Sequence, residues 1–121
     1  MDQASDKLID FETTDMLLET LEEDFFLVVD EFIKSGDILS SKIKHLVDQN
    51  PGDIDSLIAV THTLKGASGN IGAMLLSRIC EKLEIALHDN QTSHIPDQAS
   101  RVEQIYHQTR EEYLRVFKKA S

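Results

Sequence analysis

His62 is the residue of this chain whose surroundings best suit chemistry. On a helical wheel of about 100° per residue, several small or apolar residues lie within about 40° of the pole opposite this histidine. They are Leu57, Val60, Leu64, Ala67 and Ile71. The pattern predicts that these residues face a core and that His62 faces outward. The alternative, a core histidine held by a buried partner, disagrees with this wheel.

An outward imidazole is a suitable phosphoryl acceptor, because its unperturbed pKa of about 6.5 leaves one ring nitrogen with a free lone pair at cellular pH. That nitrogen can attack phosphorus in line and later act as a leaving group. The chain contains no Walker loop and no kinase-type glycine-rich strand. We therefore expect a phosphoryl carrier without its own kinase site and without a cofactor of its own. A partner would supply magnesium during transfer.

Two glycines follow His62 on the same face of the expected helix. Gly66 lies one turn on, at i+4, and Gly69 lies about two turns on. Glycine lowers helix stability, so their expected use is to let another surface approach the imidazole closely. The alternatives are that Gly66 admits a neighbouring helix and that Gly69 begins the end of its own helix.

Other neighbours of His62 fit a docking site. Lys65, at i+3, could bring an ammonium group near a phosphoryl oxygen, although a solvated surface lysine is the alternative. Ile58 and Ala59 lie about one turn before His62 on the same face. Exposed apolar residues around a polar centre are typical of a surface that binds a protein.

Helical periodicity runs through the blocks that Pro51 and Pro96 separate, and no block alternates as a strand would. The first helix is expected after a cap at Thr13 or Thr14. Longer helices are expected over about 23–47, from an N-cap at Asp53 to about residue 69, and over about 73–88 and 98–118. Gly36 either lies inside the second helix or ends a helix there.

Short turns between these helices favour antiparallel packing. The fold class we expect is all-α, an antiparallel four-helix bundle with a short additional N-terminal helix. Residues 1–12 are expected to form a tail and residues 13–119 the bundle. In the helix over 73–88, Cys80 falls among apolar residues, whereas Glu84 and His88 fall on a polar stripe. We expect Cys80 to be a small core residue and not a reactive thiol.

The overall charge excludes several classes of partner. With 22 acidic and 12 basic residues, the net charge is −10, which repels nucleic-acid backbones and anionic membranes. The chain has one cysteine among 121 residues, and its N-terminus lacks the pattern of a signal peptide. We expect a cytoplasmic monomer that binds neither nucleic acid nor membrane.

The segment from His62 to Ala73, HTLKGASGNIGA, resembles the signature of histidine-containing phosphotransfer (HPt) domains. The resemblance implies that His62 takes a phosphoryl group from an aspartate of one receiver domain and passes it to another. It implies that Lys65 helps to hold the phosphoryl group and that Gly66 gives access. The implied partners are response-regulator receiver domains and a hybrid sensor histidine kinase.

One position departs from the family's pattern. Many members carry a glutamine on the following helix, near the histidine, where this chain has Glu84. A carboxylate would repel a phosphoryl group, which leaves hydrogen bonding to His62, or orientation of its ring, as the role of Glu84.

A rival function is a helical module that binds a receiver domain, or another signalling protein, without being phosphorylated. Pure binding would not require His62, Lys65 and Gly66 at this spacing. A metal-carboxylate bundle is a third possibility, but the paired Glu-x-x-His motifs of such bundles are absent from the sequence.

Overall fold

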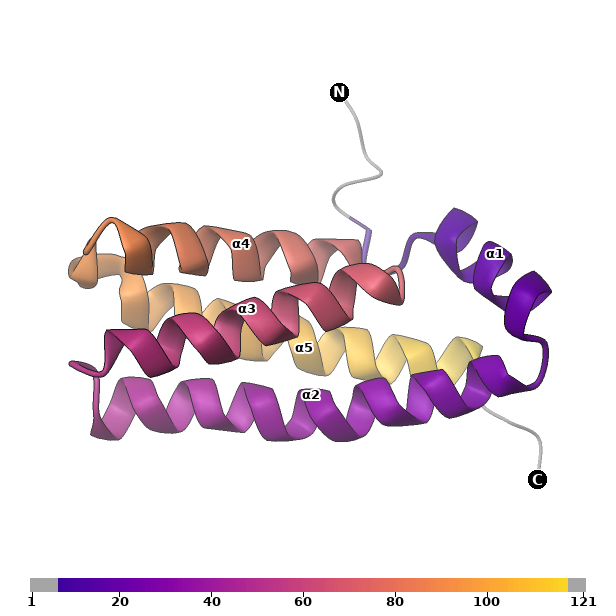
Figure 1. The fold of residues 1–121 in the computed structure, drawn as a ribbon, viewed down its shortest axis with the longest axis horizontal. Helices are drawn as coiled ribbons and strands as arrows, with labels where there is room; N and C mark the ends of the chain where they lie inside the picture. The colour runs from indigo at the N-terminus through magenta and orange to yellow at the C-terminus, as the bar shows by residue number, and fades with distance from the viewer. Residues whose placement is uncertain (1–6, 118–121) are drawn as a thin grey trace.

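The computed structural model describes residues 7–117, and the ordered elements of this part of the chain are all helical (Figure 1). In chain order they are α1 (Phe11–Leu21), α2 (Asp24–Gln49), α3 (Ile54–Asn70), α4 (Met74–His88), the short 3₁₀ helix η2 (Thr92–His94) and α5 (Ile95–Val116). No strand occurs within these residues. The predicted all-α fold class is confirmed.

The four long helices form an antiparallel bundle. α2 packs against α3 and α5, and α4 packs against the same two helices. α1 contacts α2 and crosses one end of the bundle (Figure 1). The largest fully buried side chains include Phe25 and Ile43 from α2, Leu57 and Leu64 from α3, Leu76 and Leu83 from α4, and Tyr106 and Tyr113 from α5. One core thus joins all four helices.

α1 begins at Phe11, so the predicted cap at Thr13 or Thr14 is wrong. Asp10 is the N-cap, and its side chain accepts a hydrogen bond from the backbone N–H of Glu12 at 3.3 Å. An aspartate accepts such bonds as well as a threonine does. The Asp10 N–H donates to the carbonyl of Gly72 at 2.8 Å, which ties the start of α1 to the turn between α3 and α4.

α2 runs through Gly36 without a break, which decides between the two alternatives left by the sequence. The glycine is buried against the ring of Tyr106, and a Cβ at this position would overlap that ring. The Tyr106 hydroxyl lies 2.8 Å from the Ile33 carbonyl and 2.6 Å from Oδ1 of Asp37. Gly36 therefore allows α5 to approach α2 closely.

The turn from α3 to α4 depends on Gly72, whose φ of +88° favours glycine. Just before it, the carbonyl of Ile71 accepts a hydrogen bond of 2.6 Å from the buried hydroxyl of Tyr113 on α5. This bond fixes the end of α3 against the core, and with it the position of the His62 face.

The helix ends match the expected ranges within a few residues. Asp53 caps α3 as predicted, with its side chain accepting from the N–H of Ser56 at 3.2 Å. α5 begins at Ile95, three residues before the expected start, because Pro96 fits the first turn of a helix. The expected helix end at Lys118 and bundle end at 119 lie outside the described residues.

None of the helices within residues 7–117 combines the length and apolar character that crossing a bilayer requires.

Candidate functional site

His62 lies in the middle of α3 with its side chain 65% exposed. On the opposite side of the helix, Leu57 and Leu64 are fully buried, and Val60 and Ile71 are nearly so. Ala67 is partly buried and packs against the same core. The prediction that His62 faces outward is confirmed, because the 3.6-residue period of the apolar positions directs the other face of α3 into the bundle.

Glu84 of α4 joins His62 and Lys65 into one cluster. Its Oε2 lies 3.1 Å from Nδ1 of His62, and its Oε1 lies 2.8 Å from Nζ of Lys65. The Glu84 side chain is 13% exposed, far less than that of His62. The carboxylate is thus held at the seam between α3 and α4, while the imidazole extends into solvent.

The paired charges shift each other's pKa. The hydrogen bond with Lys65, followed by the one with His62, holds the pKa of Glu84 below its ordinary value, although partial burial opposes this. The same bond with Glu84 raises the pKa of Lys65 above its ordinary value. At neutral pH, Glu84 is therefore a carboxylate and Lys65 an ammonium.

This charge state determines the tautomer of His62. An ionised carboxylate can only accept a hydrogen bond, so Nδ1 of His62 must carry the proton that it donates to Glu84. In the neutral ring, the lone pair then resides on Nε2. No hydrogen bond to Nε2 is formed within residues 7–117. The site presents a solvent-facing nitrogen nucleophile of defined tautomer.

Gly66 leaves the space beside this nucleophile open. A Cβ built at Gly66 would meet no heavy atom within 4 Å outside the adjoining backbone of α3, so no neighbouring helix packs there. The alternative that Gly66 admits a helix is therefore wrong. The open space that access to His62 requires is present, and access by a partner stays a prediction.

Gly69 lies in different surroundings. A Cβ at this position would stand 3.5 Å from Oγ of Ser77, which itself donates to the Lys65 carbonyl at 3.2 Å. The Gly69 carbonyl also accepts a hydrogen bond of 3.3 Å from the N–H of Gly72. Gly69 thus belongs to the contact between α3 and α4 and to the end of α3.

The two apolar residues expected around His62 differ in exposure. Ala59 is exposed, whereas Ile58 is half-buried and packs against the core. Ile58 is therefore less exposed than expected, and its part in docking stays a prediction. At this position the side chain reaches back toward the bundle, because the apolar face of α3 is broader than the five positions on the wheel.

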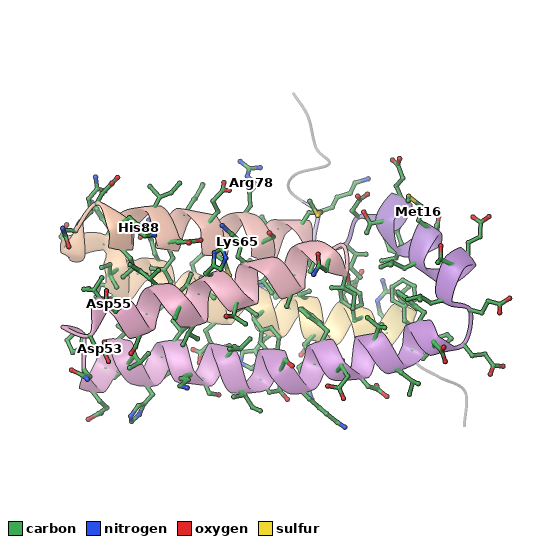
Figure 2. All side chains as sticks on the ribbon, viewed as in Figure 1. Met16, Asp53, Asp55, Lys65, Arg78 and His88 are labelled. Carbon is green, nitrogen blue, oxygen red and sulfur yellow. The ribbon has the colours of Figure 1, made fainter. Side chains whose placement is uncertain are left out.

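The sequence places His88 on the polar stripe with Glu84 but gives it no part in the site. Its Nε2 lies 3.8 Å from the same Oε2 of Glu84 that faces His62. Figure 2 labels Lys65 on α3 and His88 on α4, the two helices that border the site. The signal was available in the sequence, since Glu84 and His88 are four residues apart on one helical face.

Two further features limit the chemistry of the site. Cys80 is fully buried, and burial raises the pKa of its thiol to about 12, so it is a core residue as predicted. Within the described residues, no group of three or more histidine, cysteine, aspartate or glutamate side chains could hold a metal ion.

Solved structures with the same architecture are phosphotransfer proteins. Histidine-containing phosphotransfer protein B from Pseudomonas aeruginosa superposes with a TM-score of 0.86 at 21% identity, over 94% of this chain and 97% of that one. A putative histidine-containing phosphotransfer protein from rice gives 0.79 at 23% identity, over 94% and 84% of the two chains. The maize protein ZmHP2 gives 0.79 at 23% identity, over 96% and 94%. At such identities, the likeness establishes the fold.

Sequence comparison establishes the family. Among curated proteins, none matches this chain significantly. The sequence model of the Hpt domain, however, matches residues 11–115, which include all five α-helices almost completely and the whole cluster around His62. This chain therefore belongs to the Hpt domain family, whose role is phosphotransfer in two-component signalling.

Proposed function

We propose that this chain is a phosphorelay intermediate that accepts a phosphoryl group on Nε2 of His62 from a receiver-domain aspartate and passes it to another receiver domain. The observation that carries the proposal is the pairing of an exposed Nε2 with an Nδ1 held 3.1 Å from the Glu84 carboxylate. A module that only bound its partner would gain nothing from an imidazole held in one tautomer.

In the transfer step, one bond forms to Nε2 of His62 and one bond of the partner's aspartyl phosphate breaks. The lone pair of Nε2 attacks phosphorus in line, the new N–P bond forms, and the P–O bond of the aspartyl phosphate breaks. The electron pair of that bond remains on the aspartate oxygen, and the Nδ1 proton stays on the ring against Glu84. Donation to the next receiver is the reverse of this step.

The neighbours of His62 have separate parts in this mechanism. Lys65 lies one turn along α3 and supplies a cation that can contact a phosphoryl oxygen. Gly66 leaves room for the partner's aspartyl phosphate, which must come within about 3–3.5 Å of the attacking nitrogen. Ala59 adds exposed apolar surface one turn before His62. A magnesium ion would be held by the receiver domain and would balance charge on the phosphoryl group.

The experiment is to incubate the chain with phosphorylated receiver domains and to locate any phosphorylated residue by mass spectrometry. We expect the label on His62 and none in His62→Gln. Because the side chain is exposed, this substitution should change the free energy of unfolding by about 0.5 kcal/mol or less.

The matched control is His45→Gln, which removes another exposed histidine, on α2. This variant should accept phosphate as the unmodified chain does. Phosphorylation that persisted in a folded His62→Gln variant would place the nucleophile elsewhere. Stable binding of a receiver with no phosphorylated residue would favour the rival function of a non-phosphorylated binding module.

A further inference from the structure

The contact between Glu84 and His62 acquires a second role once the ring is phosphorylated. Bond formation uses the Nε2 lone pair while Nδ1 retains its proton, so the ring becomes a phosphoimidazolium cation. Its positive charge then faces Oε2 of Glu84, which lies 3.1 Å from Nδ1. The ion pair that results does not exist while the ring is neutral.

The Nδ1 proton decides how readily the phosphoryl group leaves. When the N–P bond of a phosphoimidazolium breaks, the electron pair returns to Nε2 and the leaving group is a neutral imidazole. When Nδ1 has lost its proton, the same cleavage releases an anionic imidazolate, which is a much poorer leaving group. The rate of donation therefore follows the protonated fraction of the ring.

We infer that Glu84 is a positioning residue that keeps phosphorylated His62 protonated at Nδ1, and thereby extends efficient phosphoryl donation to higher pH. The inference rests on the proposed function, since it concerns the phosphorylated form of the same histidine. It assigns Glu84 a charge-dependent role, beyond the choice of tautomer that any hydrogen-bond acceptor could make.

Glu84 is well placed to remain charged throughout the relevant pH range. Its other oxygen is paired with Nζ of Lys65 at 2.8 Å, and this contact holds the pKa of Glu84 below its ordinary value. With a side chain only 13% exposed, the carboxylate is also screened by water less than a surface carboxylate is. Its attraction for a cation at Nδ1 is therefore stronger than that of an ordinary surface pair.

The other charged groups near the site also favour or oppose protonation of the phosphorylated His62 ring. Lys65 opposes protonation of the ring, and so does His88 when it is protonated, 3.8 Å from Glu84. Glu81, exposed on α4, acts in the same direction as Glu84, whereas buried Cys80 is uncharged because its pKa is raised to about 12. Within residues 7–117, no side chain of α2 or α5 pairs with this cluster.

The charge of Glu84 sets the expected size of the shift in the pH at which the phosphorylated ring loses its proton. An opposite charge within about 4–6 Å favours the charged form of a group by about one pH unit or more. Replacing Glu84 by the neutral, nearly isosteric glutamine should lower the pH at which the phosphoimidazole ring loses its proton by about one unit. At a pH above both midpoints, donation should then slow about tenfold, because the protonated fraction falls tenfold per pH unit.

The experiment uses phosphoramidate as the phosphoryl donor, so that loading does not depend on a receiver. The phosphohistidine signal is followed by ³¹P NMR from pH 5 to pH 9 in the full chain, in Glu84→Gln and in Glu81→Gln. The last is the matched control, because it removes one negative charge from an exposed position on the same helix. We expect the titration midpoint to fall by about one unit in Glu84→Gln and by a small fraction of that in Glu81→Gln.

A second measurement follows donation to one receiver domain across the same pH range. The rate in Glu84→Gln should match that of the full chain at low pH and fall behind at high pH, since only the protonated fraction differs. Equal midpoints in Glu84→Gln and the unmodified chain would overturn the inference while leaving the proposed function intact. Failure of every receiver to phosphorylate His62 would instead overturn the proposed function.

Discussion

A methyl group added at Gly66 would meet no heavy atom within 4 Å outside the adjoining backbone of its own helix, although His62 lies only one turn away. Within an otherwise regular helix, glycine costs about 1 kcal/mol relative to alanine. Neither packing nor backbone geometry requires it here, because its φ is not positive. At the scale of single residues, the glycine therefore matters for the space that it leaves beside His62, where a partner would bind.

We expect Gly66→Ala to raise the free energy of unfolding by about 1 kcal/mol and the melting temperature by about 4 °C. The same variant should slow phosphotransfer, and Gly66→Gln should slow it further, because each side chain projects beside Nε2. Transfer rates from one receiver, set beside the melting temperature of each variant, separate the two effects. Unchanged transfer in Gly66→Gln would refute the access argument, and so would a loss that merely tracked unfolding.

At the scale of helices, the bundle depends on how closely α5 approaches α2. Tyr106 fills the space above Gly36, and its hydroxyl lies between the Ile33 carbonyl and the Asp37 carboxylate. Burial, followed by the hydrogen bond to Asp37, raises the pKa of this hydroxyl above its ordinary value. The ring is fully buried and held at its polar end, so it has little freedom to move away.

Gly36→Ala should therefore lower the free energy of unfolding by about 1–3 kcal/mol, because a methyl group would force Tyr106 out of its place. Gly66→Ala is the matched control, since it makes the same change in a helix where nothing opposes the methyl group. Urea unfolding of both variants tests the contrast. If Gly36→Ala and Gly66→Ala raised the free energy of unfolding equally, the Tyr106 ring would be shown to move without cost.

At the scale of the whole molecule, negative charge exceeds what the observed ion pairs neutralise. The net charge is −10. The ion pairs described include Lys44–Glu103 at 3.7 Å and Arg115–Glu112 at 2.8 Å, both with an exposed basic partner. Exposed pairs of this kind contribute little to stability, about 0–1 kcal/mol each. Self-repulsion should therefore be the larger electrostatic effect on the folded state.

We accordingly expect the melting temperature to rise when sodium chloride is increased from about 0.01 M to about 0.15 M, since the Debye length falls from about 30 Å to about 8 Å. Thermal unfolding followed by circular dichroism at pH 7 measures this. A double variant, Glu12→Gln with Glu19→Gln, neutralises two exposed glutamates of α1. Its melting temperature should rise less over the same range of salt. A melting temperature that fell with salt would mean that attractive pairs dominate.

Much of this fold and site was determined by the sequence alone. The outward position of His62 depends on the periodicity of α3 itself, and the cap at Asp53 on a side chain three residues from its donor. Such features depend on residues within a few turns of one helix, so they can be read along the chain. The same holds for the family signature from His62 to Ala73.

Tertiary structure decided what depends on residues far apart in the chain. The resemblance suggested His62 as a partner of Glu84, 22 residues later in the chain. That the same carboxylate also reaches Lys65 could not be identified before α4 was set in register against α3. The use of Gly36 depends on Tyr106, about seventy residues later. Helical periodicity specifies the face on which a residue lies, but packing between helices specifies what that face meets.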